Sequence, residues 1–500
     1  MQMTRREFIA RGGMIGAGMM MPSALLHASS AIVAALPDES AIRRLSSKLR
    51  GRLIRPDDPS YDSARHIFSW NPATEKRPAL IVRCADTDDI ARSIEFARTH
   101  GLEVAVRGGG HDVFGASLCD GMVIDLSQMK NIEVDAASHT ARVEAGVRSG
   151  ELNVATEKYG LAAALGCNPV VGIAGLTLGG GLGWMLGKHG AACDNLRSIR
   201  MVIADGRRLT ASEHENSDLF WALRGGGGNF GVATSFEYDL HPQGEIVGGF
   251  LLYPRSEARR LYRFYRDFMR DAPDELAIET TFDPRGLTVM ICFSGDPARG
   301  QEVLRPLHEF GAPLHGEVVT TPYLGLQGPP LHPHTGGAAD PGAPHRQPPH
   351  QMPRFIYWKG VYLRALNDAA IDTIVEAGND APEGWSIGLG HYMHGAACRV
   401  AANDTPVYRE TGGCCCFVNQ GWNDPSRAAG AMYWVDAVWQ KLTPISGGHA
   451  YVNYLSDDSR GGVQSAYGAN YARLVALKDK YDPDNFFHLN RNIRPDSGRG

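Results

Sequence analysis

The sequence lacks several features that mark large classes of protein. It contains no paired C-x-x-C set with zinc spacing and no iron–sulfur cysteine spacing, which argues against a zinc site and a molybdopterin partner. It has no long run of Lys or Arg, and its formal net charge is -5, so we expect no nucleic acid partner. No G-x-G-x-x-G motif opens a βαβ unit with an acidic residue about 20 positions later, which disfavours a Rossmann fold.

The apolar run near the N-terminus is too short to cross a bilayer comfortably, since it extends only from Gly12 to Leu26. It follows a charged start containing Arg5 and Arg6 and precedes small residues at 28–31. This order is typical of an export signal, and the paired Arg resembles the twin-arginine type. We therefore expect residues 1–31 to direct the protein through the export machinery to the periplasm or the extracellular space.

Residues 328–353 have almost no apolar side chains and are rich in Pro, Gly and His. Histidine is a common metal ligand, but a stretch with nothing to bury is more typical of a disordered loop. The nine cysteines are scattered, and such cysteines usually act as small buried hydrophobic residues. We therefore predict no metal site.

A length of 500 residues indicates two or more domains. Apolar spacing predicts a strand, a helix and a second strand over residues 78–106. From about residue 246 to 445, strand-like and helix-like segments alternate, which predicts a separate α+β domain. Further strands are expected at 122–126, 132–134, 140–144, 246–252 and 287–293, and helices at 148–159, 257–269, 369–377 and 466–480.

Three glycine clusters lie next to expected strands, at 108–110, 166–183 and 225–231. Glycine at such places allows unusual backbone conformations and close approach to another group. Successive free N–H groups in these loops suit phosphates. Ordinary tight turns would explain one cluster, but three favour a large phosphate-bearing cofactor.

Five motifs follow one another along the chain in a recognisable order. They read R-G-G-G-H-D at 107–112, G-C-N-P-V-V-G at 166–172, L-F-W-A-L-R-G-G-G at 219–227, Y-V-N-Y at 451–454 and Y-D-P-D-N-F-F at 481–487. With these motifs the chain resembles the VAO/PCMH flavoprotein superfamily. Within that superfamily it is similar to the berberine-bridge-enzyme-like, FAD-linked oxidases.

The resemblance implies an α+β protein with the two-domain VAO/PCMH fold. An FAD-binding PCMH-type domain of two α+β subdomains would span residues 40–245. A substrate-binding domain, with a large antiparallel sheet covered by helices, would span 246–450. Residues 451–500 would form a berberine-bridge-like segment that returns to the FAD domain.

The resemblance also implies FAD attached covalently at two residues. His111 would carry the 8α-methyl group of the flavin, and Cys167 would carry ring carbon C6. The residue types suit this chemistry, because a neutral imidazole and a thiolate are both nucleophiles. The other residues expected at the cofactor are Arg107, Gly108, Gly109, Gly110, Asp112, Gly172, Ile173, Gly175, Gly179, Gly180, Gly181 and Asn490.

By the same resemblance, Tyr454 takes the proton of a substrate hydroxyl while flavin N5 accepts a hydride. A tyrosine needs a nearby positive charge to act as a base near neutrality, and Lys359 is the expected neighbour. Packing of Tyr454 against the flavin ring is the alternative. Ile173 matches a position where members of the family vary oxygen access, so oxidase and dehydrogenase activities both stay open.

The expected substrate is a small molecule, either a sugar, another alcohol or a secondary metabolite, with O2 as the acceptor and H2O2 as its product. Two alternatives keep the same flavin scaffold: oxidation of a C–N bond, as in amine and nicotine-type oxidases, and a ring-closing oxidation. A flavin-binding protein without enzymatic activity is the third alternative.

Overall fold

The structure of the protein is a computed structural model that describes residues 37–327, 353–456 and 460–496. The expected signal peptide and nearly all of the Pro- and His-rich stretch lie outside these described residues. Within them, we find no helix that combines the length and the apolar character needed to span a membrane.

The first sheet forms where the sequence predicts it. Its strand order is β1-β2-β4-β3, with β2, β4 and β3 parallel and β1 antiparallel at one edge. The crossover helix α3 (Thr87–His100) is capped by the Asp86 side chain, and it ends at Gly101, whose φ of 62° is left-handed. The strands are β1 (Arg52–Ile54), β2 (Leu80–Arg83), β3 (Val104–Arg107) and β4 (Met122–Asp125), and the helices that precede and separate β1 and β2 are α1 (Glu39–Lys48) and α2 (Tyr61–Arg65).

A second sheet is antiparallel throughout and has the order β5-β6-β10-β8-β9. Its strands are β5 (Ile132–Asp135), β6 (Thr140–Glu144), β8 (Leu196–Val202), β9 (Arg208–Ser212) and β10 (Val232–Asp239). The short strands β7 (Leu161–Ala162) and β11 (His241–Pro242) pair beside it. The helices of this region are α4 (Ser149–Glu157), α5 (Ile173–Leu178), α6 (Leu186–His189) and α7 (Ser217–Leu223).

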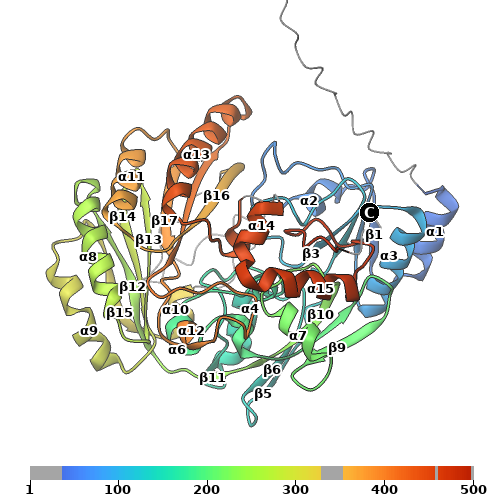
Figure 1. Ribbon diagram of the computed structural model, residues 1–500, viewed down its shortest axis with the longest axis horizontal. Helices are drawn as coiled ribbons and strands as arrows, with labels where there is room; N and C mark the ends of the chain where they lie inside the picture. The colour runs from blue at the N-terminus through green and yellow to red at the C-terminus, as the bar shows by residue number, and fades with distance from the viewer. Residues whose placement is uncertain (1–36, 328–352, 457–459, 497–500) are drawn as a thin grey trace, which may run out of the picture. The chain divides into compact units, whose positions relative to one another are not determined.

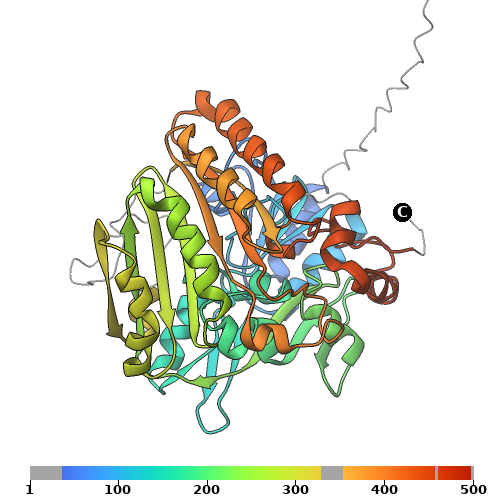
Figure 2. The same cartoon turned by 60° about the vertical axis from the view of Figure 1, so that its left-hand side comes forward.

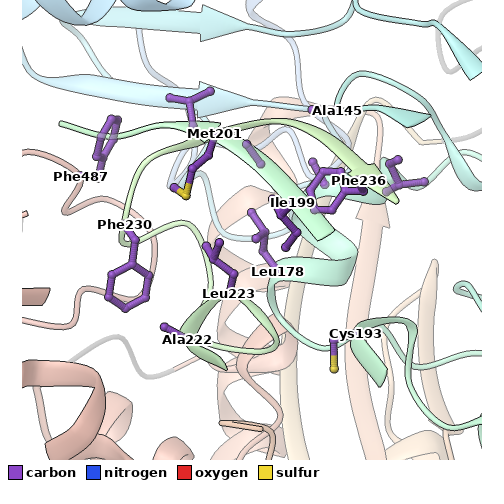
Figure 3. Close-up of a cluster of buried hydrophobic side chains, with 14 of the residues drawn as sticks. Ala145, Leu178, Cys193, Ile199, Met201, Ala222, Leu223, Phe230, Phe236 and Phe487 are labelled. Atoms are coloured by element: carbon purple, nitrogen blue, oxygen red, sulfur yellow. The ribbon is translucent and has the colours of Figure 1, made fainter. Parts of the chain in front are cut away.

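Buried side chains from distant parts of the chain share one core around the second sheet. Figure 3 shows Ile199 and Met201 from β8 together with Leu178 from α5 and Phe236 from β10. Phe487, near the C-terminus, belongs to the same hydrophobic cluster. The end of the chain therefore packs into the core built by the first half.

The third sheet has seven strands, all antiparallel, in the order β15-β12-β14-β13-β17-β18-β16. Helices α8, α9, α11 and α13 lie along one face of it (Figures 1 and 2), and their apolar side chains form a second core with that face. The predicted α+β architecture, with a large antiparallel sheet covered by helices, is confirmed. The elements are β12 (Ile246–Tyr253), α8 (Ala258–Arg270), β13 (Leu276–Asp283), β14 (Gly286–Phe293), α9 (Pro297–Glu309), β15 (His315–Thr321), α10 (Tyr323–Gln327), β16 (Phe355–Leu363), α11 (Asp368–Asn379), β17 (Trp385–Gly390), α12 (Gly395–Arg399), β18 (Cys414–Trp422) and α13 (Ala428–Leu442).

The C-terminal region contains two helices where one was predicted over residues 466–480. Helix α14 (Arg460–Tyr467) ends before α15 (Tyr471–Tyr481), and a 3-10 turn joins them. The break occurs at Gly468, whose φ of 51° cannot continue a right-handed helix. The prediction of one helix was wrong because apolar spacing alone does not locate such a break.

A buried ion pair fastens this C-terminal region to the first half of the chain. Lys478 Nζ lies 2.6 Å from Asp482 Oδ2, and both side chains have no exposed surface. The same ammonium donates to the carbonyl oxygens of Asn229, at 2.7 Å, and Phe487, at 2.8 Å. Asn229 lies within the third glycine cluster, so one lysine joins that loop to the end of the chain. The domain boundaries expected at 245/246 and 450/451 stay a prediction.

Candidate functional site

A cavity of about 1240 Å³ opens on the face of the seven-stranded sheet that the helices leave uncovered. Its wall combines the loop after β3 and helix α5 with strands β13, β16, β17 and β18, and the C-terminal segment completes it. Typical small-ligand pockets enclose roughly 300–1,000 Å³, so this cavity has room for a large cofactor together with a substrate. Among the residues expected at the cofactor, those on the wall are Gly108, Gly109, Gly110, His111, Asp112, Cys167, Gly172, Gly175 and Asn490.

The His111 side chain enters the cavity as an uncharged ring. Its imidazole stacks on Phe68 with 3.9 Å between ring centroids and 15° between planes. Burial lowers the pKa of His111 to about 4, so the ring is neutral at physiological pH. Its Nε2 is buried and has no hydrogen-bond partner among the described residues. A neutral imidazole with a free nitrogen on a cavity wall suits covalent attachment of an electrophilic carbon.

Asp112 lines the cavity, and its carboxylate accepts hydrogen bonds that stabilise the loop after His111. One oxygen accepts from the backbone N–H of Phe114 at 2.8 Å and of Gly115 at 3.1 Å. The other accepts from the backbone N–H of Ser117 at 2.7 Å and from its hydroxyl at 2.8 Å. Asp112 therefore fixes the segment that carries His111.

Two of the expected glycines are explained by a contact between loops. A Cβ added at Gly109 would overlap the backbone of Gly172, and one added at Gly172 would overlap Gly109. The loop that carries His111 and the segment that follows Cys167 therefore touch backbone to backbone. Gly175 differs, because a Cβ there would meet no atom within 4 Å, so α5 presents open backbone at the cavity.

Other residues expected at the cofactor are not among those that line the cavity, and their place at the cofactor stays a prediction. Arg107 is half-buried and donates to the carbonyl of Ala64. Ile173 is fully buried in the core of the first half. The glycines at 179–181 contact the C-terminal segment, where the Gly181 N–H donates to the Tyr451 hydroxyl at 3.0 Å.

Four polar side chains form a continuous chain along the cavity wall. The Cys167 thiol donates to Glu279 Oε1 at 3.0 Å. His391 Nδ1 lies 3.0 Å from the same oxygen, and His391 Nε2 lies 3.1 Å from the Tyr454 hydroxyl. Thiol, carboxylate and imidazole are also zinc donors and lie within 4.8 Å of one another. The Cys167–Glu279 and His391–Tyr454 contacts are hydrogen bonds, whereas His391 Nδ1 approaches Glu279 at 3.0 Å without hydrogen-bond geometry, so we describe the four side chains as a polar relay.

The electrostatics of this relay differ from one end to the other. Burial raises the pKa of Glu279, but the neighbouring His391 and the hydrogen bond from Cys167 outweigh it, so the net shift is downward. Burial and the neighbouring Glu279 carboxylate raise the pKa of the Cys167 thiol well above its usual value. Burial raises the pKa of Tyr454 well above its usual value too. The relay therefore has an ionised carboxylate at its centre and protonated groups at both ends.

Lys359 does not lie beside Tyr454, contrary to the prediction. Its Nζ lies 3.4 Å from Asp436 Oδ1 and 4.4 Å from the ring centroid of Trp439, both on α13. Trp358, the preceding residue on β16, instead lines the cavity and meets the Tyr454 ring edge-on at 4.8 Å. Successive residues of a strand point to opposite faces, so Lys359 faces the helices. His391 occupies the place that Lys359 was expected to fill.

Glu279 and His391 were missed by reasoning from the sequence. Glu279 lies on β13, where Leu276, Ile278 and Phe282 point into the helix-covered core. Alternation assigns Glu279 to the other face, which the pattern alone would place in solvent. His391 has a φ of 54°, which is unusual for a residue with a side chain. This backbone conformation is visible in the structure, but no sequence pattern predicts it.

Comparisons with known proteins agree with this geometry. The "FAD binding domain" family matches residues 78–212, and the "Berberine and berberine like" family matches residues 450–494. An uncharacterized FAD-linked oxidoreductase of Bacillus subtilis, YgaK, is 31% identical over 463 residues, which are 90% of this chain and 98% of the relative.

Solved structures with the same fold act on different molecules. The 6-hydroxy-D-nicotine oxidase of Arthrobacter nicotinovorans has a TM-score of 0.77 at 26% identity, covering 90% of this chain and 98% of its own. A carbohydrate oxidase from Microdochium nivale has a TM-score of 0.77 at 23% identity, covering 91% of this chain and 99% of its own. The fold is thus shared by proteins named for a hydroxynicotine and for a carbohydrate.

Proposed function

This chain belongs to the berberine-like family of FAD-linked oxidoreductases, which have the VAO/PCMH fold, and on that premise we propose that it oxidises a hydroxyl group of a small molecule with covalently bound FAD. The observation that carries the proposal is the contact between Tyr454 and His391, backed by Glu279, on the wall of the cavity. This arrangement can remove the proton of a substrate hydroxyl. An oxidation of this kind needs that proton to leave as the hydride departs.

The residues around the cavity fit the cofactor that the family carries. His111 offers a neutral ring and a nitrogen without a partner among the described residues. Cys167 offers a thiol on the same wall, and its segment touches the His111 loop through Gly109 and Gly172. We propose that His111 and Cys167 both hold the flavin covalently. FAD, when bound, supplies the hydride acceptor at its N5 atom.

Tyr454 and His391 would share the removal of the substrate proton. Because the pKa of Tyr454 is raised, the tyrosine rests as a neutral phenol and cannot be the base by itself. It can accept the substrate proton while passing its own proton to His391 Nε2, 3.1 Å away. Glu279, 3.0 Å from the other ring nitrogen, would hold the ring in that orientation and stabilise its positive charge. This is the base-and-orienter arrangement used by many hydrolases.

Oxidation of a C–N bond is the second candidate, because the family includes the nicotine oxidase named above. A neutral amine loses a hydride without any base for a hydroxyl proton, so that reaction would leave the Tyr454–His391 contact unused. The contact therefore favours a hydroxyl substrate. We further propose O2 as the electron acceptor, and export of the protein through the twin-arginine signal at its N-terminus.

The proposal can be tested on the purified protein with two measurements. Flavin absorbance that stays with the protein after acid precipitation shows covalent attachment. A panel of sugars, other alcohols and amines, followed by flavin bleaching without O2 and by peroxide formation with O2, then identifies the substrate class. Bleaching by amines alone would contradict oxidation of a hydroxyl, and bleaching without peroxide would contradict O2 as the acceptor.

A further inference from the structure

The Cys167 thiol lies between apolar walls and one carboxylate. Cys167 packs against a small apolar cluster that includes Trp184, Met185 and Ile246. Cys292 and Tyr323 also lie in this cluster, and burial raises the pKa of both, so they are protonated. Across the cavity wall, Glu279 accepts the hydrogen bond of the thiol at 3.0 Å.

A half-buried thiol between apolar walls needs a base before it can form a bond to carbon. The thiolate is the nucleophile, and apolar surroundings disfavour it. The raised pKa of Cys167 means that almost no thiolate exists at neutral pH. The Glu279 carboxylate is ionised, and its Oε1 accepts the hydrogen bond of the thiol while His391 Nδ1 lies 3.0 Å from the same oxygen. It can take that proton at the moment when the sulfur reacts.

We propose that Glu279 is the general base that activates Cys167 for bonding to the flavin ring. The inference rests on the proposed two-link attachment and adds the group that makes the second link possible. It also gives Glu279 two uses: one during cofactor attachment, and one afterwards behind His391 and Tyr454. Glu279 contributes little to the histidyl link, because His111 is neutral without help.

The step balances as follows. The S–H bond of Cys167 breaks, its proton goes to Glu279, and the sulfur electron pair forms a bond to ring carbon C6. That carbon loses its hydrogen as a proton, and the ring system keeps two electrons and is thereby reduced. Dioxygen, a two-electron acceptor that becomes H2O2, returns the ring to its oxidised form. The proton on Glu279 can leave through His391 and Tyr454, at separations of 3.0 and 3.1 Å, to the cavity.

Peptide mapping tests the step without relying on turnover. Cleavage after Lys and Arg places His111 in peptide 108–130 and Cys167 in peptide 159–188, where it is the single cysteine. Denaturation in iodoacetamide alkylates Cys167 only if its sulfur is not bonded to flavin. In the wild-type protein we expect flavin to join the two peptides and peptide 159–188 to stay unalkylated.

Glu279→Gln should leave flavin on peptide 108–130 while Cys167 becomes alkylated. During incubation of the purified variant in air, the second link should form about 10²-fold more slowly, a typical loss for removal of a general base. The retained histidyl flavin shows that the variant folds. Asp283→Asn is the matched control, because Asp283 lines the cavity from the same strand but is hydrogen-bonded to Arg285. That variant should form both links as the wild type does.

Glu279→Asp covers the case in which Glu279→Gln does not fold. The shorter side chain keeps a charge beside His391 but draws the carboxylate back from the sulfur, so the second link should form about ten-fold more slowly or worse. Equal rates of the second link in the wild type and in a folded Glu279 variant would overturn the role of Glu279. A wild-type protein whose Cys167 is alkylated while flavin stays on His111 would overturn the two-link attachment itself.

Discussion

His391 Nε2 lies 3.1 Å from the hydroxyl of Tyr454, and this contact joins the C-terminal segment to the turn after the seven-stranded sheet's β17. The two residues are 63 positions apart in the sequence, and neither can remove a substrate proton without the other. The phenol is too weak an acid to rest as a base, and the imidazole reaches the cavity contents only through the phenol. The pair is therefore one functional unit, and substitutions within it should not have additive effects.

Tyr454→Phe should slow flavin reduction by the substrate by about 10²–10⁴-fold, the usual cost of losing general base catalysis. Flavin loading should not change, because Tyr454 is not an attachment residue. Stopped-flow absorbance without O2 measures the reduction rate. Tyr357→Phe serves as the control, since Tyr357 bonds Asp436 at 3.0 Å. Unchanged reduction in Tyr454→Phe would remove this tyrosine from the mechanism.

His391→Gln should slow flavin reduction to a similar extent, because an amide can hydrogen bond to Tyr454 but cannot take its proton. The double variant with Tyr454→Phe should be hardly slower than either single variant. The rates of flavin reduction in the wild type, the two single variants and the double variant give the coupling energy between Tyr454 and His391 directly. Multiplicative losses would mean that the two residues act independently. Lys359→Met should reduce flavin as the wild type does, since Lys359 faces α13.

The histidyl link should form equally well in mildly acid solution. Because the pKa of His111 is lowered to about 4, its ring stays neutral as the pH falls from 7 to 5. An ordinary histidine, with a pKa of about 6.5, would be almost fully protonated at pH 5. The fraction of flavin that resists acid precipitation, measured during loading at several pH values, should therefore decline only near pH 4. A decline centred near pH 6.5 would mean that His111 is not desolvated.

Lys478→Met should lower the free energy of unfolding by about 3–5 kcal/mol, because it leaves the Asp482 carboxylate buried without its counter-charge. Urea unfolding followed by tryptophan fluorescence measures this loss. Lys480→Met, in the same helix, is the control, because Lys480 is 57% exposed in its pair with Asp218 and should contribute at most about 1 kcal/mol. Adding Asp482→Asn to Lys478→Met should restore part of the stability. Equal losses at positions 478 and 480 would contradict the buried pair.

Replacing Arg5 and Arg6 together by Lys should keep the protein inside a bacterial host that has twin-arginine export, with residues 1–31 still attached. Fractionation followed by the mass of the retained chain measures this result. Arg11→Lys, outside the pair, should be exported normally. Export of the double variant at the wild-type level would exclude a twin-arginine signal.

Much of the scaffold could be predicted from the sequence because it depends on local patterns. The strands around His111 and the cap of α3 at Asp86 follow from apolar spacing and from one acidic side chain at a helix start. The relay could not be predicted in the same way. Glu279 lies 112 residues from Cys167 in the sequence. Alternation along β13 predicts only that the Glu279 side chain points away from the helix-covered core.

The error at Lys359 has a related cause. A motif places residues along the chain, but a shift of one position on a strand reverses the face to which a side chain points. Trp358 and Lys359 therefore have opposite surroundings although they are neighbours.

The backbone contact between Gly109 and Gly172 limits how far apart His111 and Cys167, the two proposed attachment residues, can be. A flavin has one rigid distance between its 8α carbon and C6, and it cannot stretch to meet two loops that have moved apart. A methyl group at either glycine would force such a separation. Alanine at position 109 or 172 would therefore prevent the bond between Cys167 and the flavin without altering either nucleophile. The absence of a side chain at both glycines thus keeps the two loops close enough for one flavin ring to reach both residues.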